Sequence, residues 1–354
     1  MASKYLRLAA ELRQLCASLQ QQGQPRLPGE LALCETYHCS RQTVRRALEQ
    51  LASEGLVVRI HGSGTYLSGD RSVRSKRITL LCSSLDNYFY PQLLRDLEKI
   101  FSSHGFSTEA YSTGNRVMDE RKVLERILDD PPSGILLEGA KTALPSPNLD
   151  LLARIDSLKI PLIYLHAAFP FPEGTPCIQD DNVGGARQLT RYLLEKGHRN
   201  VAAILKSDDQ QGLERYEGLV TTLCQYGCTL REESIFWFDT AQREALLAGR
   251  DEWMYAFIRR RLAGCSAVLC YNDEIAYSLI HCLHAEGLRV PEDVAVVGFD
   301  NSHYCTIGPV SITSLAHERH QMANTAAEAM LNLIRGRKVR SVRMPWIIRE
   351  RASG

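Results

Sequence analysis

From residue 78 onward, short apolar runs alternate with segments of helical length. The runs are ITLLCSS (78–84), GILLEG (134–139), PLIYLH (161–166), VAAILK (201–206), AVLCYN (267–272) and VAVVGF (294–299). Several are apolar almost throughout, as is typical of strands buried on both faces. Amphipathic segments such as YPQLLRDLEKIFSSHG and GGARQLTRYLLEKGHR lie between them. The alternation predicts βαβ units and parallel sheets in two lobes, with ligands at the carboxyl ends of the strands.

The first 68 residues have a different texture, with mostly helical apolar spacing. We expect one helix over 5–22, a second beginning near Pro28-Gly29-Glu30 and a third beginning after Ser40, a good N-cap residue. The segment VVRIHGSGTYL then alternates around glycines and predicts a hairpin. The polar stretch GDRSVRSKR has no periodicity and predicts a linker. The expected domains are therefore 1–68, a linker over 69–77, and 78–354.

Charge divides the chain in the same place. The 354 residues carry 42 Lys+Arg and 41 Asp+Glu, a net charge of +1. Residues 1–77 hold 12 basic and 6 acidic side chains, or +6, which leaves 30 against 35, or −5, for the rest. A small basic head on a larger acidic body is the first functional clue, because basic patches attract phosphate backbones.

Several classes of protein are disfavoured. The N-terminus lacks the apolar core of a secretory signal, and no run approaches the roughly 20 apolar residues of a membrane span. The eleven cysteines form no C-x-x-C pair, so we expect reduced thiols in a cytoplasmic protein and no metal site. The motifs H-E-x-x-H, G-x-S-x-G and G-x-x-x-x-G-K-[ST] are absent. We therefore expect neither an enzyme nor a cofactor.

The third predicted helix carries a candidate DNA-reading face. In SRQTVRRALEQL, one buried stripe is expected at Val44, Ala47, Leu48 and Leu51. The opposite face carries Arg41, Gln42, Arg45 and Arg46, with Thr43 alongside. Arg and Gln can pair bidentately with base edges in the major groove. The alternative is a solvated face on which Arg45 and Glu49 form an i, i+4 ion pair. A preceding short helix, a tight turn and the Gly-rich hairpin favour a winged helix-turn-helix.

The segment LPGELALCETYHCSRQTVRRALEQLASEGLVVRIHGSGTYL closely resembles the DNA-binding domain of the GntR regulator family. The resemblance implies DNA contacts from the recognition helix and from the wing tip, which would enter the minor groove. The implied DNA-binding residues are Ser40, Arg41, Gln42, Thr43, Arg45, His61 and Gly62. The family usually has an arginine where this chain has Leu31.

The body resembles the effector-binding domain of LacI-type repressors, which are related to periplasmic sugar-binding proteins. The likeness rests on CYNDEIAYSLIHCLHAEGLRVPEDVAVVGFDNS, on QDDNVGGARQLTRYLLEKGHRNVAAI and on RYEGL at 215–219. A GntR head on such a body is the arrangement of the arabinose repressors called AraR, and ILLEGAKTALPSPNLDLL is similar to that group as well. The resemblance implies a winged helix-turn-helix joined to a two-lobed α/β periplasmic-binding-protein-like domain.

A sugar needs planar bidentate partners for its hydroxyls and an aromatic face for its C–H surface. The resemblance and these requirements together indicate effector contacts from Tyr88, Tyr90, Glu138, Lys141, Arg215, Asn272 and Asp300. Each has an alternative role. Asp300 could end its strand in an Asx turn, Arg215 could form an interdomain salt bridge, the tyrosines could pack the lobes, and Glu138 and Lys141 could be exposed loop residues. LacI-type domains often have an acidic residue where this chain has His166.

Residues 180–182 follow the strand-like CIQ run. We expect Asp181 and Asn182 to cap the following helix, and Asp180 is a candidate for the cleft.

The function that these observations predict is ligand-controlled repression. A homodimer would read a pseudo-palindromic operator on double-stranded DNA, and L-arabinose or another pentose would release it. The alternatives are a regulator of the same type that responds to a nucleoside or a sugar phosphate, and a plain sugar-binding protein. An aminotransferase body, which some GntR-headed proteins carry, is disfavoured because this body is shorter and lacks the pattern.

Overall fold

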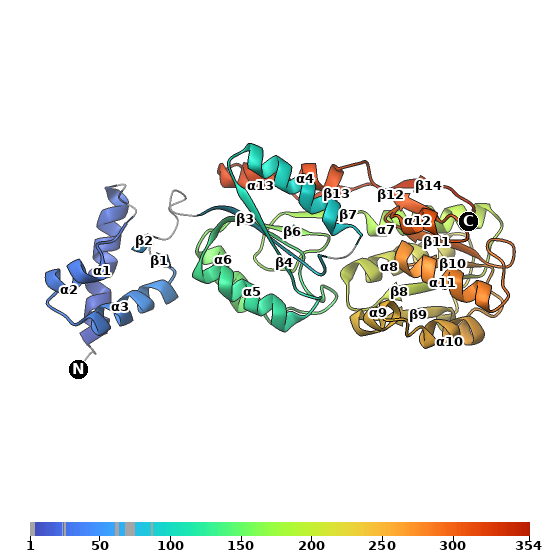
Figure 1. The fold of residues 1–354 in the computed structure, drawn as a ribbon, viewed down its shortest axis with the longest axis horizontal. Coiled ribbons are helices and arrows are strands. Elements are labelled where there is room, and N and C mark those ends of the chain that lie inside the picture. The colour runs from blue at the N-terminus through green and yellow to red at the C-terminus, as the bar shows by residue number, and fades with distance from the viewer. Residues whose placement is uncertain (1–3, 23, 25, 61–63, 68–74, 86–87) are drawn as a thin grey trace.

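The computed structural model describes residues 4–22, 24, 26–60, 64–67, 75–85 and 88–354. The head contains three helices and a two-stranded hairpin, drawn in blue in Figure 1. These elements are α1 (Lys4–Gln21), α2 (Glu30–Thr36), α3 (Arg41–Ser53), β1 (Val57–Ile60) and β2 (Gly64–Leu67). The hairpin is antiparallel, with Val57 opposite Leu67. The three predicted helices and the predicted hairpin are confirmed.

Local sequence explains how α3 begins. Ser40 is extended, and its hydroxyl accepts a hydrogen bond from the backbone N–H of Thr43, so it caps the helix as expected. His38, in the tight turn between α2 and α3, adopts a left-handed φ of 50°. The stripe of Val44, Ala47, Leu48 and Leu51 is at most 1% exposed and packs on α1.

The first lobe is a six-stranded parallel sheet in the order β13-β7-β6-β5-β3-β4. Its strands are β3 (Ser75–Cys82), β4 (Ser107–Ser112), β5 (Pro132–Leu137), β6 (Leu162–Leu165), β7 (Cys177–Asp180) and β13 (Val342–Met344). Helices α4 (Tyr90–Ser103) and α13 (Gln321–Ile334) pack on one face of this sheet, and α5 (Val117–Asp129) and α6 (Leu149–Ser157) pack on the other. Strands β5 and β6 are buried along their whole length, as their apolar sequences predicted.

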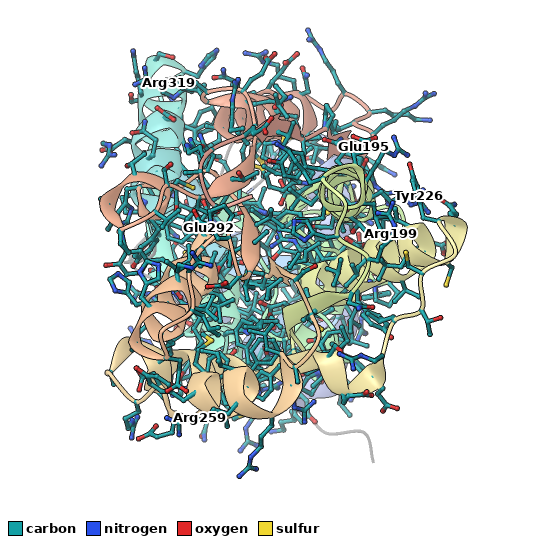
Figure 2. The ribbon with its side chains drawn as sticks, turned by 90° about the vertical axis from the view of Figure 1, so that its right-hand side faces the viewer. Glu195, Arg199, Tyr226, Arg259, Glu292 and Arg319 are labelled. Atoms are coloured by element: carbon teal, nitrogen blue, oxygen red, sulfur yellow. The ribbon has the colours of Figure 1, made fainter. Side chains whose placement is uncertain are left out.

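The second lobe has a six-stranded sheet in the order β14-β12-β11-β10-β8-β9, in which only the β12–β14 pair is antiparallel among the described strands. The strands are β8 (Val201–Lys206), β9 (Ile235–Phe238), β10 (Ala267–Cys270), β11 (Ala295–Phe299), β12 (Thr313–Ala316) and β14 (Ile347–Arg349). The helices are α7 (Asn182–Glu195), α8 (Gln210–Gln225), the 3-10 helix η2 (Glu232–Ser234), α9 (Thr240–Leu247), α10 (Glu252–Arg261), α11 (Asp273–Ala285) and α12 (Tyr304–Ile307). Figure 2 views the molecule from the side of this lobe, with Arg259 marking α10 and Glu195 marking the end of α7.

Three segments cross between the lobes, so the two sheets are not independent units. The chain passes from β7 to α7, from β12 to α13 and from β13 to β14. The carboxyl ends of β7 and β12 both lie at this crossing region, where the sequence analysis expected ligands to bind.

Two details differ from the expectations. Strand β3 begins at Ser75, so residues 75–77 of the predicted 69–77 linker belong to the first sheet. The strands β4, β9, β12, β13 and β14 were not among the predicted runs. STEAYS is polar, IFWF is short and aromatic, and the last three strands have only three or four residues each. None of the described helices is long and apolar enough to cross a membrane.

Candidate functional site

The recognition helix presents its polar residues outward. Of the seven predicted DNA-binding residues, Ser40, Arg41, Gln42 and Arg45 are exposed and Thr43 is half-buried. His61 and Gly62 lie outside the described residues. Arg41 and Arg46 form no ion pair with any described carboxylate, which leaves their guanidinium groups available for phosphates or base edges.

The side chain of Arg45 is neither free for DNA nor paired with Glu49, the two roles expected for it. Its Nε donates to Glu30 at 2.9 Å, and Arg59 on β1 donates to the other oxygen of Glu30 at 2.7 Å. The i, i+4 pair with Glu49 is not formed; Arg59 lies 3.8 Å from Glu49 instead. Glu30 thus ties the recognition helix to the wing. The departure at Leu31 places an apolar side chain, 58% exposed, on α2.

A cleft of about 1160 Å³ lies between the two lobes. It is lined by six of the seven predicted effector residues: Tyr88, Tyr90, Glu138, Arg215, Asn272 and Asp300. Lys141 does not line it. The Lys141 ammonium lies 3.8 Å from Asp208 and is partly exposed, so the alternative of a loop residue describes it better.

Arg215 forms the floor of the cleft on the second lobe and is 2% exposed. Its Nε donates to the side chain of Asn182 at 3.0 Å, and another N–H donates to the backbone oxygen of Tyr271. The guanidinium lies 4.0 Å from the ring centre of Phe299 and 4.0 Å from the Asp300 carboxylate. Arg215 and Asp300 belong to the same lobe, so this contact is not the interdomain salt bridge considered as an alternative.

Asp300 connects the lobes through an aromatic hydroxyl. The Tyr88 hydroxyl of the first lobe donates to Asp300, and Asn272 donates to the same hydroxyl at 3.2 Å. Burial, with Arg215 opposing it, raises the pKa of Asp300. The side chain of Asn272 also caps α11 by accepting from the N–H of Ile275 at 3.0 Å. Asp300 has a left-handed φ of 93°, and its carboxylate points at Tyr88 and Arg215 rather than at the backbone of its own turn.

A second polar group in the cleft was only partly expected. Asp180 accepts from His166 at 3.0 Å with one oxygen and from His317 at 2.8 Å with the other. Burial alone raises the pKa of Asp180, but the hydrogen bonds from the two histidines outweigh it and lower the pKa. Burial lowers and Asp180 raises the pKa of His166, and the net shift is upward. His166 stands where LacI-type domains often have an acidic residue. In this chain the carboxylate at this place is that of Asp180, at the end of the next strand, and it is hydrogen-bonded to His166.

His317 joins all three crossings between the lobes. It follows β12, its Nε2 faces Asp180 at the end of β7, and its Nδ1 faces the backbone oxygen of Pro345 between β13 and β14 at 3.0 Å. Its ring stacks on Trp346 with centroids 3.7 Å apart. Because both partners are acceptors, the two hydrogen bonds form together only when both ring nitrogens carry hydrogens.

Lys206 is a third polar group of the cleft, and it was not among the predicted site residues. It is 4% exposed at the end of β8, and its ammonium lies 2.9 Å from Asp208 and 2.6 Å from Asp209. Burial lowers its pKa, but the two carboxylates outweigh burial and raise it. Asn115 of the first lobe donates to Asp209 at 3.0 Å, which makes a second contact across the cleft. The three charged residues of KSDD (206–209), at the end of the VAAILK run, were the available signal.

Asp273 supports the cleft from behind. Its carboxylate accepts from the backbone N–H of Ser302 at 2.7 Å and from the Ser314 hydroxyl at 2.6 Å, so it holds the loop that presents Asp300. Burial, and then the charge of Asp300, raises the pKa of Asp273 to about 7. The neighbouring Gly298 has no room for a side chain, since a Cβ there would lie 2.7 Å from Asp273.

The three residues at the start of α7, 180–182, have different roles, and only one of them caps the helix. Asp181 caps the helix by accepting from the N–H of Gly184 at 3.1 Å, as predicted. Asn182 does not cap; its side chain accepts from Arg215 and donates to Glu214 at 2.9 Å. Asp180 lines the cleft.

Comparison with known proteins agrees with both parts of the chain. Residues 4–67 match the family of bacterial regulatory proteins called the gntR family, and residues 190–353 match the periplasmic binding protein-like domain. Over 348 residues, 95% of this chain and 92% of the other, the sequence is 30% identical to an arabinose metabolism transcriptional repressor of Geobacillus stearothermophilus. It is 31% identical to the repressor of that name in Halalkalibacterium halodurans, over 87% and 83% of the two chains. The chain belongs to the arabinose metabolism transcriptional repressor family.

The fold comparison gives the same architecture. The solved complex of the transcriptional regulator CelR with cellobiose covers 89% of this chain and 90% of its own, with a TM-score of 0.69 and 24% identity. The predicted winged head on a LacI-type body is confirmed for this family member. The relatives are transcriptional regulators, so the prediction of a DNA-binding regulator rather than an enzyme is confirmed as well.

Proposed function

We propose that this family member represses sugar-utilisation genes and is released from its operator when L-arabinose or another pentose enters the cleft. The observation that carries the proposal is the convergence of Arg215, Asn272 and Asp300 with Tyr88 in the cleft. Charged and amide groups of this kind hold vicinal hydroxyls, and Phe89 and Tyr90 supply apolar ring surface beside them. The protein would act in the cytoplasm, where its operator DNA is.

The charges of the cleft favour a neutral ligand over a sugar phosphate. Seven carboxylates line it, from Asp96, Glu138, Asp180, Asp209, Glu244, Asp300 and Glu318. The buried cations beside them are already engaged, because Lys206 pairs with two aspartates and Arg215 donates to Asn182 and Tyr271. A phosphate would meet carboxylates with no free buried cation among these groups to neutralise it.

The proposed switch is a change in the angle between the lobes of a homodimer. A sugar that contacts Tyr88 on one lobe and Asp300 on the other favours one arrangement of the lobes, and the two heads then lose their matched spacing on a pseudo-palindromic operator. Release requires that the sugar bind the DNA-free arrangement better. A coupling of about 1–3 kcal/mol changes operator affinity about 5–150-fold.

The experiment uses an operator duplex selected from a random DNA library by the full-length protein. Thermal-shift measurements first compare pentoses, hexoses, nucleosides and sugar phosphates, since a ligand at about 100 times its Kd adds about 2.7 kcal/mol. Fluorescence anisotropy then measures operator release by each ligand that stabilises the protein. Release by a pentose supports the proposal. Release by a nucleoside or a sugar phosphate alone discards the pentose, and failure to enrich any duplex discards the operator.

A further inference from the structure

The segment RGRKVRSVR, residues 335–343, is the most basic stretch of the body, and we refer to it as the basic loop. It holds five Lys/Arg and no Asp/Glu: Arg335, Arg337, Lys338, Arg340 and Arg343. Residues 78–354 carry 30 basic and 35 acidic side chains, so without this loop the body would have 25 against 35. The loop is therefore positively charged, whereas the body as a whole has a net negative charge. The loop is part of neither the cleft nor the recognition helix.

All five basic side chains of the loop are exposed, and no described carboxylate pairs with any of them. Arg337 donates to the side chain of Asn332 at 3.2 Å. Arg343 donates to the side-chain amide oxygen of Gln179 at 2.9 and 3.0 Å with that amide turned towards it. Some exposed arginines of the body are neutralised, for example Arg259 by Glu286 at 2.7 Å. The charge of the basic loop is therefore available to an external partner.

The topology of the first sheet places the basic loop at the same end of the strands as the connection to the head. The loop joins the end of α13 to β13, so it lies at the amino end of β13. Strands β13, β7, β6, β5 and β3 are parallel neighbours in this order, and their amino ends share one edge of the sheet. The chain arriving from the head enters that same edge at Ser75 (Figure 1).

We propose that the basic loop is a second DNA-contacting surface, which binds the phosphate backbone flanking the site read by the head. The proposal rests on the proposed operator binding. Its support is continuity of charge: the head and its connection, residues 1–77, carry +6, and the segment 69–77 alone has four basic residues and one acidic residue. DNA bound by the head brings a dense line of phosphates to this edge, and guanidinium groups match phosphate geometry. These contacts carry no sequence information; they add affinity and fix the orientation of the body.

The test neutralises the loop and measures the salt dependence of DNA binding. The loop variant is the triple substitution Arg335→Gln, Lys338→Gln and Arg340→Gln in the full-length protein. Two duplexes carry the same selected operator, one ending at the operator and one extended by about 10 bp, one helical turn, on each side. Each lost phosphate contact lowers the slope of log K against log salt by about 0.9. On the extended duplex we expect the loop variant to have a slope smaller by at least about 0.9, the value of one phosphate contact, and an affinity about 10-fold lower. On the short duplex we expect both changes to be smaller.

A matched control removes the same charge elsewhere. Arg191→Gln, Arg250→Gln and Arg260→Gln change three exposed arginines of the second lobe, the lobe that faces the viewer in Figure 2. Because both triple variants lose three positive charges, a general effect of net charge appears in both. We expect the control to keep the wild-type slope on both duplexes.

The outcomes separate this proposal from the function on which it rests. If the loop variant and the control bind the extended duplex alike, the basic loop does not contact DNA and the proposal is overturned, even though the operator is still bound. Such a result would direct the search to an acidic protein partner. If Arg41→Ala leaves operator binding unchanged, operator recognition by the head fails, and the loop proposal fails with it.

Discussion

The recognition helix and the cleft use the same residue types in opposite environments. Arg41 on α3 is exposed and has no ion pair among the described residues, whereas Arg215 in the cleft is 2% exposed and is held by Asn182, Tyr271 and Phe299. An exposed arginine is free to adapt to a phosphate or a base edge at little cost in desolvation. A buried arginine is oriented before the ligand arrives, so its removal leaves other buried groups unsatisfied. The two regions should therefore respond differently to equivalent substitutions.

The largest effect is expected at the buried arginine. Arg215→Met keeps much of the side-chain volume but removes every donor, and we expect effector affinity to fall by at least about 100-fold, since breaking a buried charged network costs about 3–5 kcal/mol. Operator affinity without effector should stay close to wild type, which gives a repressor that sugar does not release. Isothermal titration with the inducing sugar and anisotropy with the operator measure the two quantities. Sugar-driven release by this variant would show that the ligand binds elsewhere.

The exposed arginine should have a smaller and separate effect. Arg41→Ala is expected to weaken operator binding about 5–150-fold, the range of about 1–3 kcal/mol for one bidentate base contact. Sugar affinity should not change, because the substitution lies in the head. The same anisotropy and titration measurements apply, with Arg260→Gln as an exposed arginine of the second lobe for comparison. Equal operator binding by Arg41→Ala and this control would contradict the assignment of the recognition face.

The two regions also differ in how far the sequence predicted them. The stripe of Val44, Ala47, Leu48 and Leu51 follows from one helical period, and the exposed face follows directly from it. In the cleft, Arg215, Asn272 and Asp300 were predicted from the resemblance, and Tyr88 was predicted as an aromatic ring after the first strand. Their convergence agrees with the rule that ligands meet the carboxyl ends of parallel strands. The group of His166, Asp180 and His317 draws on three distant segments, so no short-range pattern could have predicted it. Lys141 was misplaced because the sequence does not show which way a loop after a strand turns.

A substitution in the crossing region between the lobes tests whether the cleft also couples sugar binding to operator binding. His317→Gln retains a hydrogen-bonding side chain but removes the ring that bridges Asp180 and Pro345 and stacks on Trp346. We expect operator affinity and sugar affinity to change little when each is measured alone. The ratio of operator affinities with and without sugar should fall by about 5-fold, a coupling loss of about 1 kcal/mol. An unchanged ratio would mean that His317 only packs the crossing.

The smallest effect concerns pH, and it should arise in the body rather than in the head. The pKa of Asp273, raised to about 7, and the pKa of His166 are both shifted upward in the folded state. At both groups the folded state therefore binds a proton more tightly than the unfolded state does. Their stabilisation is present below the unfolded pKa values, about 3.9 and 6.5, and is lost as pH rises through the folded values. In the head, the ion pair with Arg13 lowers the pKa of Glu54 to about 2, and that stabilisation is lost only on acidification.

The free energy of unfolding of the head should therefore not change between pH 6 and pH 8. Over the same rise in pH, deprotonation of Asp273 alone lowers the free energy of unfolding of the body by about 1 kcal/mol. Asp273→Asn cannot titrate, so it should reduce this slope, although the contribution of His166 remains. Urea unfolding of the full-length protein at pH 6, 7 and 8, for wild type and variant, measures the difference. Equal slopes would show that the Asp273 carboxyl does not gain or lose a proton in this range. The loop that presents Asp300 would then be held by Asp273 in one protonation state throughout this range.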